Sequence, residues 1–326
     1  MAYHSIDLFC GAGGLSLGLE AAGFESVLGV DTNADAADTY RAAFPKARME
    51  VRSIDQINFH QWRGIDLMAG GPPCQPFSNG GLRLASRDSR DMLPQFVRAV
   101  NEAKPKAFIM ENVAGLLAPR NREYLDTILE QFDSDYTLLP PRIINAADYG
   151  VPQKRLRLVV IGVRGGRLDF PAPTHAPGQQ IGAGSVLTRE SCLGEPNPSK
   201  VVYARTPDLR PSPYAGHLFN GGGRAVNLSL PAPTILASAG GNKTHFVDQL
   251  DLVPAYHKHL WDGGKPRRGA LDGARRLTVR ESALLQTFPR DMEFAGSRSS
   301  QYTQIGNAVP PRLAEVIAAS VARALH

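Results

Sequence analysis

Three short motifs in this sequence hold residues that could act as a nucleophile, an acid and a charge stabiliser. Cys74 lies in GGPPCQPFS, Glu111 in MENV, and Arg155 and Arg157 in QKRLR. A thiol can form a covalent intermediate, a carboxyl group can donate a proton, and guanidinium groups can stabilise developing negative charge. Prolines and glycines beside Cys74 make a poor core but a rigid loop, so we expect its thiol at the edge of a sheet rather than buried.

A glycine turn in DLFCGAGGL follows the first expected strand and opens a helix, which lets backbone N–H groups approach a ligand. About 20 residues further on, Asp31 ends a second strand, where a carboxylate can accept hydrogen bonds from the two hydroxyls of a ribose. The turn is not the dinucleotide fingerprint, because Ser16 stands where that pattern needs its third glycine. These features together indicate a nucleoside site and give no sign of a pyrophosphate.

The elements that must position these residues alternate between short apolar strands and amphipathic helices, which predicts an α/β fold with a doubly wound, mostly parallel sheet. The expected strands cover residues 5–9, 26–30, 65–69, 107–110 and 156–163, and the expected helices 15–22, 35–43, 92–102, 124–132, 278–286 and 311–324. The reactive residues follow these strands, so they should meet at one edge of the sheet.

Composition excludes several classes of protein. The chain has 326 residues, of which 43% are hydrophobic and 21% charged, as in a folded globular protein. It has no apolar run long enough to cross a membrane and no signal sequence at its start, so we expect a cytoplasmic protein. Three scattered cysteines form neither a disulfide framework nor a metal motif, and we expect no metal.

A middle stretch differs from the rest of the chain. Residues 165–275 carry 16 of the 32 glycines, 12 of the 25 prolines and four of the five net positive charges. Such a loop-rich, basic segment favours a separate module with a polyanionic partner. We therefore expect a catalytic and cofactor-binding domain of residues 1–164 and 293–326, and a smaller, loop- and strand-rich target-recognition domain of residues 165–292.

Together and in this order, the motifs resemble those of the DNA cytosine-5 methyltransferase family of bacterial restriction-modification systems. The match extends to RLTVRE and LQTFP, and to QIGNAVP near the C-terminus. It therefore covers both ends of the chain and skips the middle, which in the family is the variable recognition region. The late motif implies that the C-terminal segment returns to the first domain.

The resemblance implies that Cys74 adds to C6 of cytosine, which makes C5 reactive toward the methyl group of S-adenosylmethionine. Glu111 would act at N3 as a neutral carboxylic acid and Arg157 at O2, with Arg155 as support. The products would be 5-methylcytosine and S-adenosylhomocysteine. Because C6 is inaccessible within a duplex, the target base must be flipped out of the stack.

The resemblance also implies a set of cofactor contacts, and one position departs from the family. Where family members often carry Asp-Ile beside the adenine, this chain reads RSID, so either Ser53 or Asp55 could meet the adenine amino group. The expected cofactor residues are Phe9, Gly11, Gly13, Gly14, Leu15, Asp31, Thr32, Ser53, Ile54, Pro73, Leu93, Asn307 and Val309.

The expected partner is double-stranded DNA, bound by a monomer near the bacterial nucleoid, and the enzyme could be paired with a restriction endonuclease. The segment 233–242 resembles the family's threonine-containing recognition element ahead of a glycine loop. Expected DNA contacts are Gln75, Ser78, Arg90, Thr234, Ile235, Gly240, Gly241, Asn242, Lys243 and Thr244.

Four other functions compete with this hypothesis. A tRNA cytosine-5 methyltransferase would share most of the machinery, but the Cys-Phe-Thr tripeptide of that branch is missing from this sequence. A catalytically dead DNA-binding relative is disfavoured because each chemical residue type is present. A nicotinamide-dependent oxidoreductase would need the glycine replaced by Ser16, and an amino-directed methyltransferase would carry an aromatic residue in place of Cys74.

Overall fold

The structure is a computed structural model that describes residues 3–73, 91–166 and 168–325. By its internal contacts the chain divides into two compact units. Unit 1 comprises Met1–Tyr149, Arg155–Thr174 and Ala308–His326, and unit 2 comprises Gly150–Lys154 and His175–Asn307. Each unit is described by itself below.

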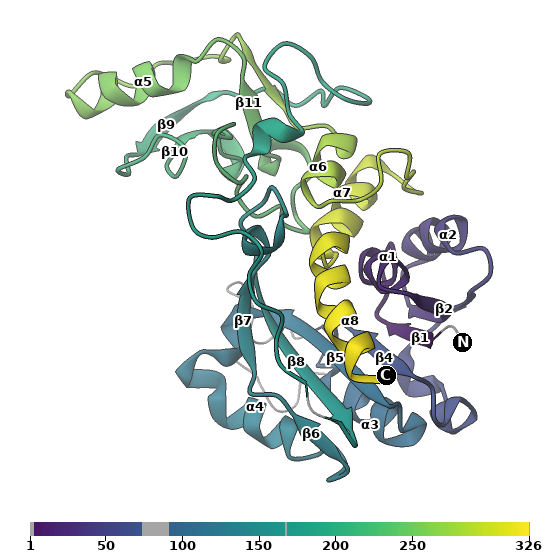
Figure 1. Cartoon of the computed structure of the whole chain (residues 1–326). Helices are drawn as coiled ribbons and strands as arrows, with labels where there is room; N and C mark the ends of the chain where they lie inside the picture. Colours follow the sequence, from purple (N-terminus) through teal and green to yellow (C-terminus); the bar gives the residue numbers. More distant parts are fainter. Residues whose placement is uncertain (1–2, 74–90, 167, 326) are drawn as a thin grey trace. The chain divides into compact units, whose positions relative to one another are not determined.

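Unit 1 is built on an eight-stranded, mostly parallel sheet in the order β3-β2-β1-β4-β5-β8-β6, with β7 paired to β8 (Figure 1). Strands β1 to β5 run parallel to one another, while β8 is antiparallel to β5, β6 and β7. The strands are β1 (Tyr3–Leu8), β2 (Phe24–Asp31), β3 (Arg48–Val51), β4 (Leu67–Gly70), β5 (Ala107–Val113), β6 (Tyr136–Leu138), β7 (Arg142–Asn145) and β8 (Leu156–Arg164). The predicted α/β class is confirmed.

The helices of unit 1 are α1 (Gly14–Ala21), α2 (Ala34–Ala43), α3 (Leu93–Ala103), α4 (Arg122–Leu129) and α8 (Pro311–Leu325). Helix α8 packs against α1, where Gly18 leaves no room for a side chain because a Cβ there would lie 2.5 Å from the carbonyl oxygen of Pro311. This contact confirms that the C-terminal segment returns to the first part of the chain, as predicted.

The core of unit 1 lies between the sheet and helices α3 and α4. Phe108 of β5 stacks on Phe132 and makes a T-shaped, edge-to-face contact with Phe96 of α3. On the neighbouring strand, a Cβ at Gly162 would lie only 2.2 Å from the Phe108 ring, so glycine is required there. Burial of these aromatic and aliphatic side chains is the main stabilising contribution to the sheet.

Unit 2 contains two small antiparallel strand pairs and three helices. The elements are β9 (Tyr203–Asp208) paired with β10 (His217–Phe219), β11 (Phe246–Asp248) paired with β12 (Ala274–Arg276), and α5 (Leu252–Trp261), α6 (Val279–Leu285) and α7 (Arg298–Asn307). A small apolar cluster around Phe246 and Tyr256 forms its core.

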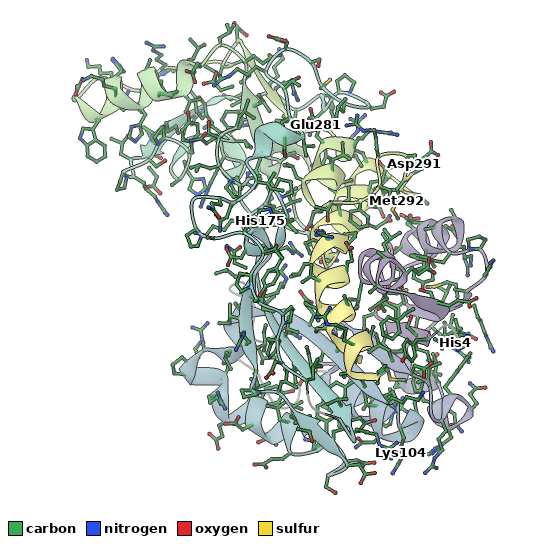
Figure 2. All side chains as sticks on the ribbon, viewed as in Figure 1. His4, Lys104, His175, Glu281, Asp291 and Met292 are labelled. Carbon is green, nitrogen blue, oxygen red and sulfur yellow. The ribbon has the colours of Figure 1, made fainter. Side chains whose placement is uncertain are left out.

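Buried polar side chains hold the loops of unit 2. Arg276 is 2% exposed and donates to the carbonyl oxygens of Thr244 (2.6 Å) and Lys200 (3.2 Å) and to Asn220 Oδ1 (2.8 Å). Glu281, labelled in Figure 2, forms a capping box with Thr278 at the start of α6 and pairs with Arg275 at 2.8 Å. These contacts replace much of the apolar packing that a regular sheet would provide.

Candidate active site

The candidate site lies in unit 1, where the carboxyl ends of β1, β2, β4 and β5 form one edge of the sheet. Phe9 follows β1, Asp31 ends β2, Pro73 follows β4, and Glu111 lies near the end of β5. Open α/β sheets bind ligands at this edge. The structure thus brings together in unit 1 residues that the sequence places far apart.

The glycine turn between β1 and α1 uses left-handed backbone conformations. Gly11 has φ 53° and Gly13 has φ 86°. A Cβ at Gly13 would also lie 2.4 Å from the Phe44 ring, so both conformation and space require glycine there. Helix α1 begins at Gly14, and its N-cap residue Gly13 provides no side-chain cap, so N–H groups at the start of the helix can serve a ligand.

Asp31 is fixed by the backbone at the end of β2. Its Oδ2 accepts a hydrogen bond from the Gly11 N–H at 2.9 Å, and its Oδ1 accepts one from the Asn33 N–H at 2.8 Å. Each carboxylate oxygen keeps lone-pair capacity for a second donor. Because Asp31 is only half-buried, its carboxylate suits the predicted pair of ribose hydroxyls.

A buried network under the glycine turn was not predicted from the sequence. Asp7 is 2% exposed, its Oδ2 accepts from the Ser16 hydroxyl at 2.7 Å, and the Ser16 and Tyr40 hydroxyls lie 3.0 Å apart. Burial raises the pKa of Asp7 to about 7. Tyr40 also packs on Gly29 of β2, where a Cβ would lie 2.6 Å from its ring. The network connects β1, α1 and α2 beneath the turn.

Two further residues predicted to contact the cofactor, Ile54 and Leu93, are buried in unit 1. Ile54 is 2% exposed, and its carbonyl oxygen accepts a hydrogen bond from Arg98 Nη2 at 2.7 Å. Ser53 is half-buried and Asp55 is exposed, so the choice between them stays a prediction. Leu93 is fully buried at the start of α3.

The other predicted cofactor residues occupy different environments. Thr32 is exposed after β2, and Val309 is 7% exposed in unit 1. Asn307 is exposed at the end of α7 in unit 2. The role of each in cofactor binding stays a prediction.

The predicted acid and its guanidinium partner are adjacent. Arg157 Nε of β8 lies 2.6 Å from Glu111 Oε1 of β5, and both side chains are largely buried, at 14% and 11% exposure. The antiparallel pairing of β5 with β8 produces this contact, because it sets Arg157 opposite Val113, two residues beyond Glu111. The ion pair is therefore a product of strand register.

Arg155 has a different environment from Arg157. It is completely buried, and its Nη2 donates to the carbonyl oxygen of Ala308 at 2.9 Å. Burial lowers its pKa well below the usual range, and the nearby positive charge of Arg157 acts in the same direction. Its burial favours a supporting role over direct contact with a base, which remains a prediction.

The loop that carries the predicted nucleophile begins beside this ion pair. A Cβ on Gly71 would lie 3.0 Å from Glu111 Oε2, so the backbone passes close to the carboxylate. Asn112 Nδ2 donates to the Pro72 carbonyl oxygen at 2.9 Å, and the Met92 N–H donates to that of Pro73 at 3.2 Å. Asn112, within MENV, was not predicted as a site residue, yet it holds this loop to β5.

Cys74 itself lies outside the described residues, as do the predicted DNA contacts Gln75, Ser78 and Arg90. In the described part of the loop before it, Gly71 lies against Glu111 and the Pro72 carbonyl oxygen is bonded to Asn112.

The predicted recognition residues lie in unit 2. Ile235 and Thr244 are each 1% exposed, and their hydrogen bonds hold the loop: the Ile235 N–H donates to Gln153 Oε1 (3.0 Å) and Thr244 Oγ1 to the Ala239 carbonyl oxygen (2.7 Å). Thr234 Oγ1 donates to the Lys154 carbonyl oxygen at 2.6 Å. The exposed positions are Gly241, Asn242 and Lys243, while Gly240 is partly exposed. Their contacts with DNA stay predictions.

The sheet, the glycine turn and the carboxylate after β2 define a Rossmann-like methyltransferase. The chain belongs to the C-5 cytosine-specific DNA methylase family, whose model matches residues 3–187 and 233–323. This membership confirms the resemblance drawn from the sequence and disfavours both the oxidoreductase and the tRNA alternatives.

Comparison with individual proteins agrees with this membership. The chain is 36% identical to the type II methyltransferase M1.HphI of Haemophilus parahaemolyticus over 98% of this chain and 87% of that protein. It is 32% identical to the type II methyltransferase M.NgoMIV of Neisseria gonorrhoeae, covering 100% and 99%. The solved structure of Entamoeba histolytica methyltransferase EhMeth shares the fold, with a TM-score of 0.69 at 17% identity and 98% coverage of both chains.

The described residues contain neither a membrane-spanning helix nor a metal-binding cluster. No helix in residues 3–73, 91–166 and 168–325 is long and apolar enough to cross a membrane. Within the same ranges, no group of three or more histidine, cysteine, aspartate or glutamate side chains could hold a metal ion.

Proposed function

We propose that this protein transfers the methyl group of S-adenosylmethionine to C5 of a flipped-out cytosine in a specific short sequence of double-stranded DNA. The observation that carries the proposal is the Glu111–Arg157 pair, which lies against Gly71 three residues before Cys74. One carboxyl and one guanidinium beside the start of a cysteine loop match the groups that cytosine activation requires. Family membership supports the same reaction.

The chain's own residues account for activation of the ring. The Cys74 thiolate would form a bond to C6 while negative charge moves toward N3 and O2. Glu111 would donate a hydrogen bond or a proton at N3, and Arg157 would stabilise the charge at O2. Loss of the proton from C5 and expulsion of the thiolate would then restore the aromatic ring.

S-adenosylmethionine, when bound, supplies the methyl group as an electrophilic carbon on a sulfonium. The residues of unit 1 fit this cofactor: the uncapped start of α1 offers N–H groups, and the half-buried Asp31 carboxylate offers acceptors for two hydroxyls. The Gly11 N–H donates a hydrogen bond to Asp31. This bond connects the glycine turn, which would hold the methionine part, to the carboxylate that would hold the ribose.

The type II methyltransferase names of the relatives support a role in restriction-modification. We propose that methylation protects host DNA from a cognate endonuclease, and that the enzyme acts as a monomer at the DNA in the bacterial cytoplasm. Unit 2 would recognise the DNA sequence, since its loops around Asn242 and Lys243 are exposed.

Bisulfite sequencing of a plasmid incubated with the protein and S-adenosylmethionine tests the reaction. We expect protection of cytosines within a single short sequence, and no protection when S-adenosylmethionine is left out. Parallel incubation with tRNA should give no 5-methylcytosine. Methylation of tRNA alone would overturn the assignment of DNA as substrate.

Substitution of Glu111 by glutamine sharpens this test. Glutamine keeps the size but cannot donate a proton as a carboxylic acid, so kcat should fall by roughly 10² to 10³. Binding of S-adenosylmethionine should change by less than about threefold, because Asp31 and the glycine turn are untouched. Glu130→Gln, on an exposed side chain of unit 1 with no assigned role, serves as a matched acid-to-amide control for kcat.

A further inference from the structure

Unit 2 contains a polar pocket of about 530 Å³, lined by the predicted DNA contacts Gly240, Gly241 and Lys243 and by other residues to which the sequence gives no role. It lies between the glycine loop that follows Ala239, the segment around Ser199 and the start of α7. The side chains and loop positions that matter for its chemistry are Ser199, Ser238, Gly241, Lys243, Arg298 and Ser299.

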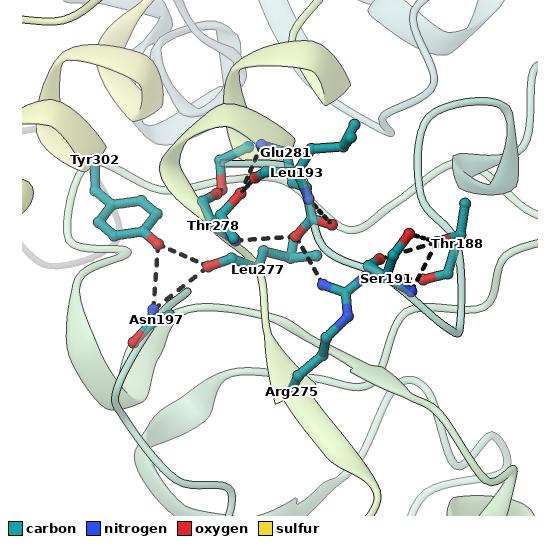
Figure 3. Close-up of polar contacts among 10 residues, drawn as sticks. Thr188, Ser191, Leu193, Asn197, Arg275, Leu277, Thr278, Glu281 and Tyr302 are labelled. Atoms are coloured by element: carbon teal, nitrogen blue, oxygen red, sulfur yellow. Dashed lines mark hydrogen bonds and ion pairs between the residues drawn. The ribbon is translucent and has the colours of Figure 1, made fainter. Parts of the chain in front are cut away.

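The walls of this pocket are held in place by hydrogen bonds. Asn197 Oδ1 accepts from the Ser199 N–H at 3.0 Å, and Asn197 Nδ2 donates to the Tyr302 hydroxyl at 3.2 Å (Figure 3). Tyr302, which is buried, in turn donates to the Leu277 carbonyl oxygen at 2.6 Å. The pocket therefore has a defined floor rather than being a gap between loose loops.

Helix α7 is held to the opposite wall. Thr303 Oγ1 donates to the Ala237 carbonyl oxygen at 3.0 Å. One turn later, a Cβ at Gly306 would lie 2.3 Å from the Leu236 carbonyl carbon, so the helix and the segment before the glycine loop are in direct contact. This contact fixes Arg298 and Ser299 opposite the glycine loop.

The pocket is positively charged and carries no acidic side chain. Lys243 and Arg298 line it, and neither forms an ion pair with any residue in the described part of the chain. A Cβ on Gly240 would lie 3.5 Å from Ser299 Oγ, and one on Gly241 would lie 3.7 Å from Ser199 Oγ. A serine hydroxyl thus lies close to each of the two glycines of the loop.

Backbone groups add to this donor set. Within the described ranges, the N–H groups of Gly241 and Asn242 donate to no protein acceptor, and Gly241 has φ 56°. The pocket therefore offers two unpaired cationic side chains, several hydroxyls and open N–H groups on a glycine turn, and it contains no carboxylate. Such a set of donors selects a tetrahedral oxyanion.

We propose that this pocket binds one phosphate of the DNA backbone and so fixes the register of unit 2 on the duplex. The proposal rests on the proposed function, because it takes duplex DNA as the substrate. Phosphate contacts position a protein without reading sequence, so the pocket would set where the exposed Asn242 meets the DNA. Arg298, Ser299 and Ser199 thereby gain a role that the motifs do not indicate.

The test measures DNA affinity over a series of salt concentrations for the full-length protein and the variants Arg298→Ala, Lys243→Ala and the double variant. Each lost phosphate contact should reduce the slope of log K against log salt by about 0.9. We expect the double variant to bind cognate and unrelated duplexes about tenfold more weakly, with unchanged thermal unfolding because both side chains are exposed. Lys46→Ala, an exposed lysine in unit 1, is the charge-matched control.

Duplexes with single neutral methylphosphonates identify the contact. A methylphosphonate at one position of the duplex should weaken binding of the wild-type protein at least threefold. The same substitution should leave binding of the double variant unchanged. The proposal would be overturned if the wild type and the double variant had equal salt slopes and equal sensitivity to the methylphosphonates. Stabilisation by inorganic phosphate at constant ionic strength with an unchanged DNA slope would also overturn it, since the pocket would then take a free anion.

Methyl transfer by the wild-type protein in the same preparations separates the two hypotheses. If wild type methylates cytosine C5 and the variants keep the wild-type salt slope, only the pocket proposal fails. If wild type methylates no duplex, the proposed function fails.

Discussion

The two units of this protein hold their functional residues in different ways. In unit 1, Asp31, Glu111 and Arg157 lie near the ends of strands, and an apolar core supports these strands. In unit 2, buried polar side chains such as Arg276 hold loops in place. A regular sheet suits catalytic residues that need fixed positions, whereas a surface that reads a DNA sequence can be rebuilt by changing loops around a few hydrogen-bonded residues.

The largest expected effect falls on unit 1. Cys74→Ser should reduce methyl transfer to below about 1% of wild type, because loss of a covalent nucleophile costs orders of magnitude. Cofactor affinity should stay within a few fold, since Asp31 and the glycine turn do not depend on the thiol. Turnover by the variant at more than about 1% would show that the nucleophile lies elsewhere.

Exchange of residues 165–275, most of which lie in unit 2, tests whether sequence recognition and methyl transfer reside in different parts of the chain. Replacing residues 165–275 by the matching region of a relative should change the methylated sequence while the product remains 5-methylcytosine. Bisulfite sequencing reads both outcomes at once. If the exchanged protein methylated the original sequence, recognition would have to reside outside residues 165–275.

Arg276 tests whether buried polar contacts hold unit 2 together. Arg276→Met would leave the acceptors of Thr244, Lys200 and Asn220 without their donor, at a cost of about 3 to 5 kcal/mol in the free energy of unfolding. Arg210→Met removes an exposed arginine paired with Asp208 and should cost less than about 1 kcal/mol.

Urea unfolding of both variants measures these differences. Binding of S-adenosylmethionine, a property of unit 1, should survive Arg276→Met at temperatures where the protein remains folded. Equal stability of the two variants would show that the buried hydrogen bonds of Arg276 contribute little.

A smaller effect concerns pH and the Asp7 network in unit 1. The pKa of Asp7 is raised to about 7 by burial, from 3.8 in the unfolded chain, so the folded protein binds more protons between these values. Its contribution to stability is therefore fully present below about pH 4 and is lost as the pH rises through 7. Between pH 5 and 8 the loss should be about 2 to 3 kcal/mol.

Asp7→Asn should remove this component of the pH dependence. Thermal unfolding at several pH values would show a flatter profile for the variant than for wild type. Identical profiles would mean that Asp7 is ionised in the folded protein at neutral pH.

The comparison of the units also explains what the sequence could predict. Strands β1, β2, β4, β5 and β8 were predicted to within a few residues because each is an apolar run of the right length. Strands β3, β6 and β7 were missed, since RMEV, YTL and RIIN are short and partly exposed. Helix α7 was missed because RSSQYTQIGN has few apolar residues and packs through polar contacts instead.

The same limit applies to the site. Cys74, Glu111 and Arg157 were predicted because motifs name residue types that do chemistry. Asp7, Ser16 and Tyr40 were not predicted, although Asp7 stands in the glycine-turn motif DLFCGAGGL. A buried hydrogen-bond network depends on the distances between elements, which the sequence does not give. A charged residue inside an otherwise apolar strand was the only available signal.

The central claim is covalent activation of a flipped cytosine by Cys74, and duplex DNA with 5-fluorocytosine at the target position tests it most directly. Fluorine cannot leave C5 as a cation, so after thiolate addition and methylation the enzyme should remain attached. Mass spectrometry should find a denaturation-stable adduct on the peptide that contains Cys74, dependent on S-adenosylmethionine and reduced in Glu111→Ala. An adduct on Cys10 or Cys192, or none at a target confirmed by bisulfite sequencing, would contradict the mechanism.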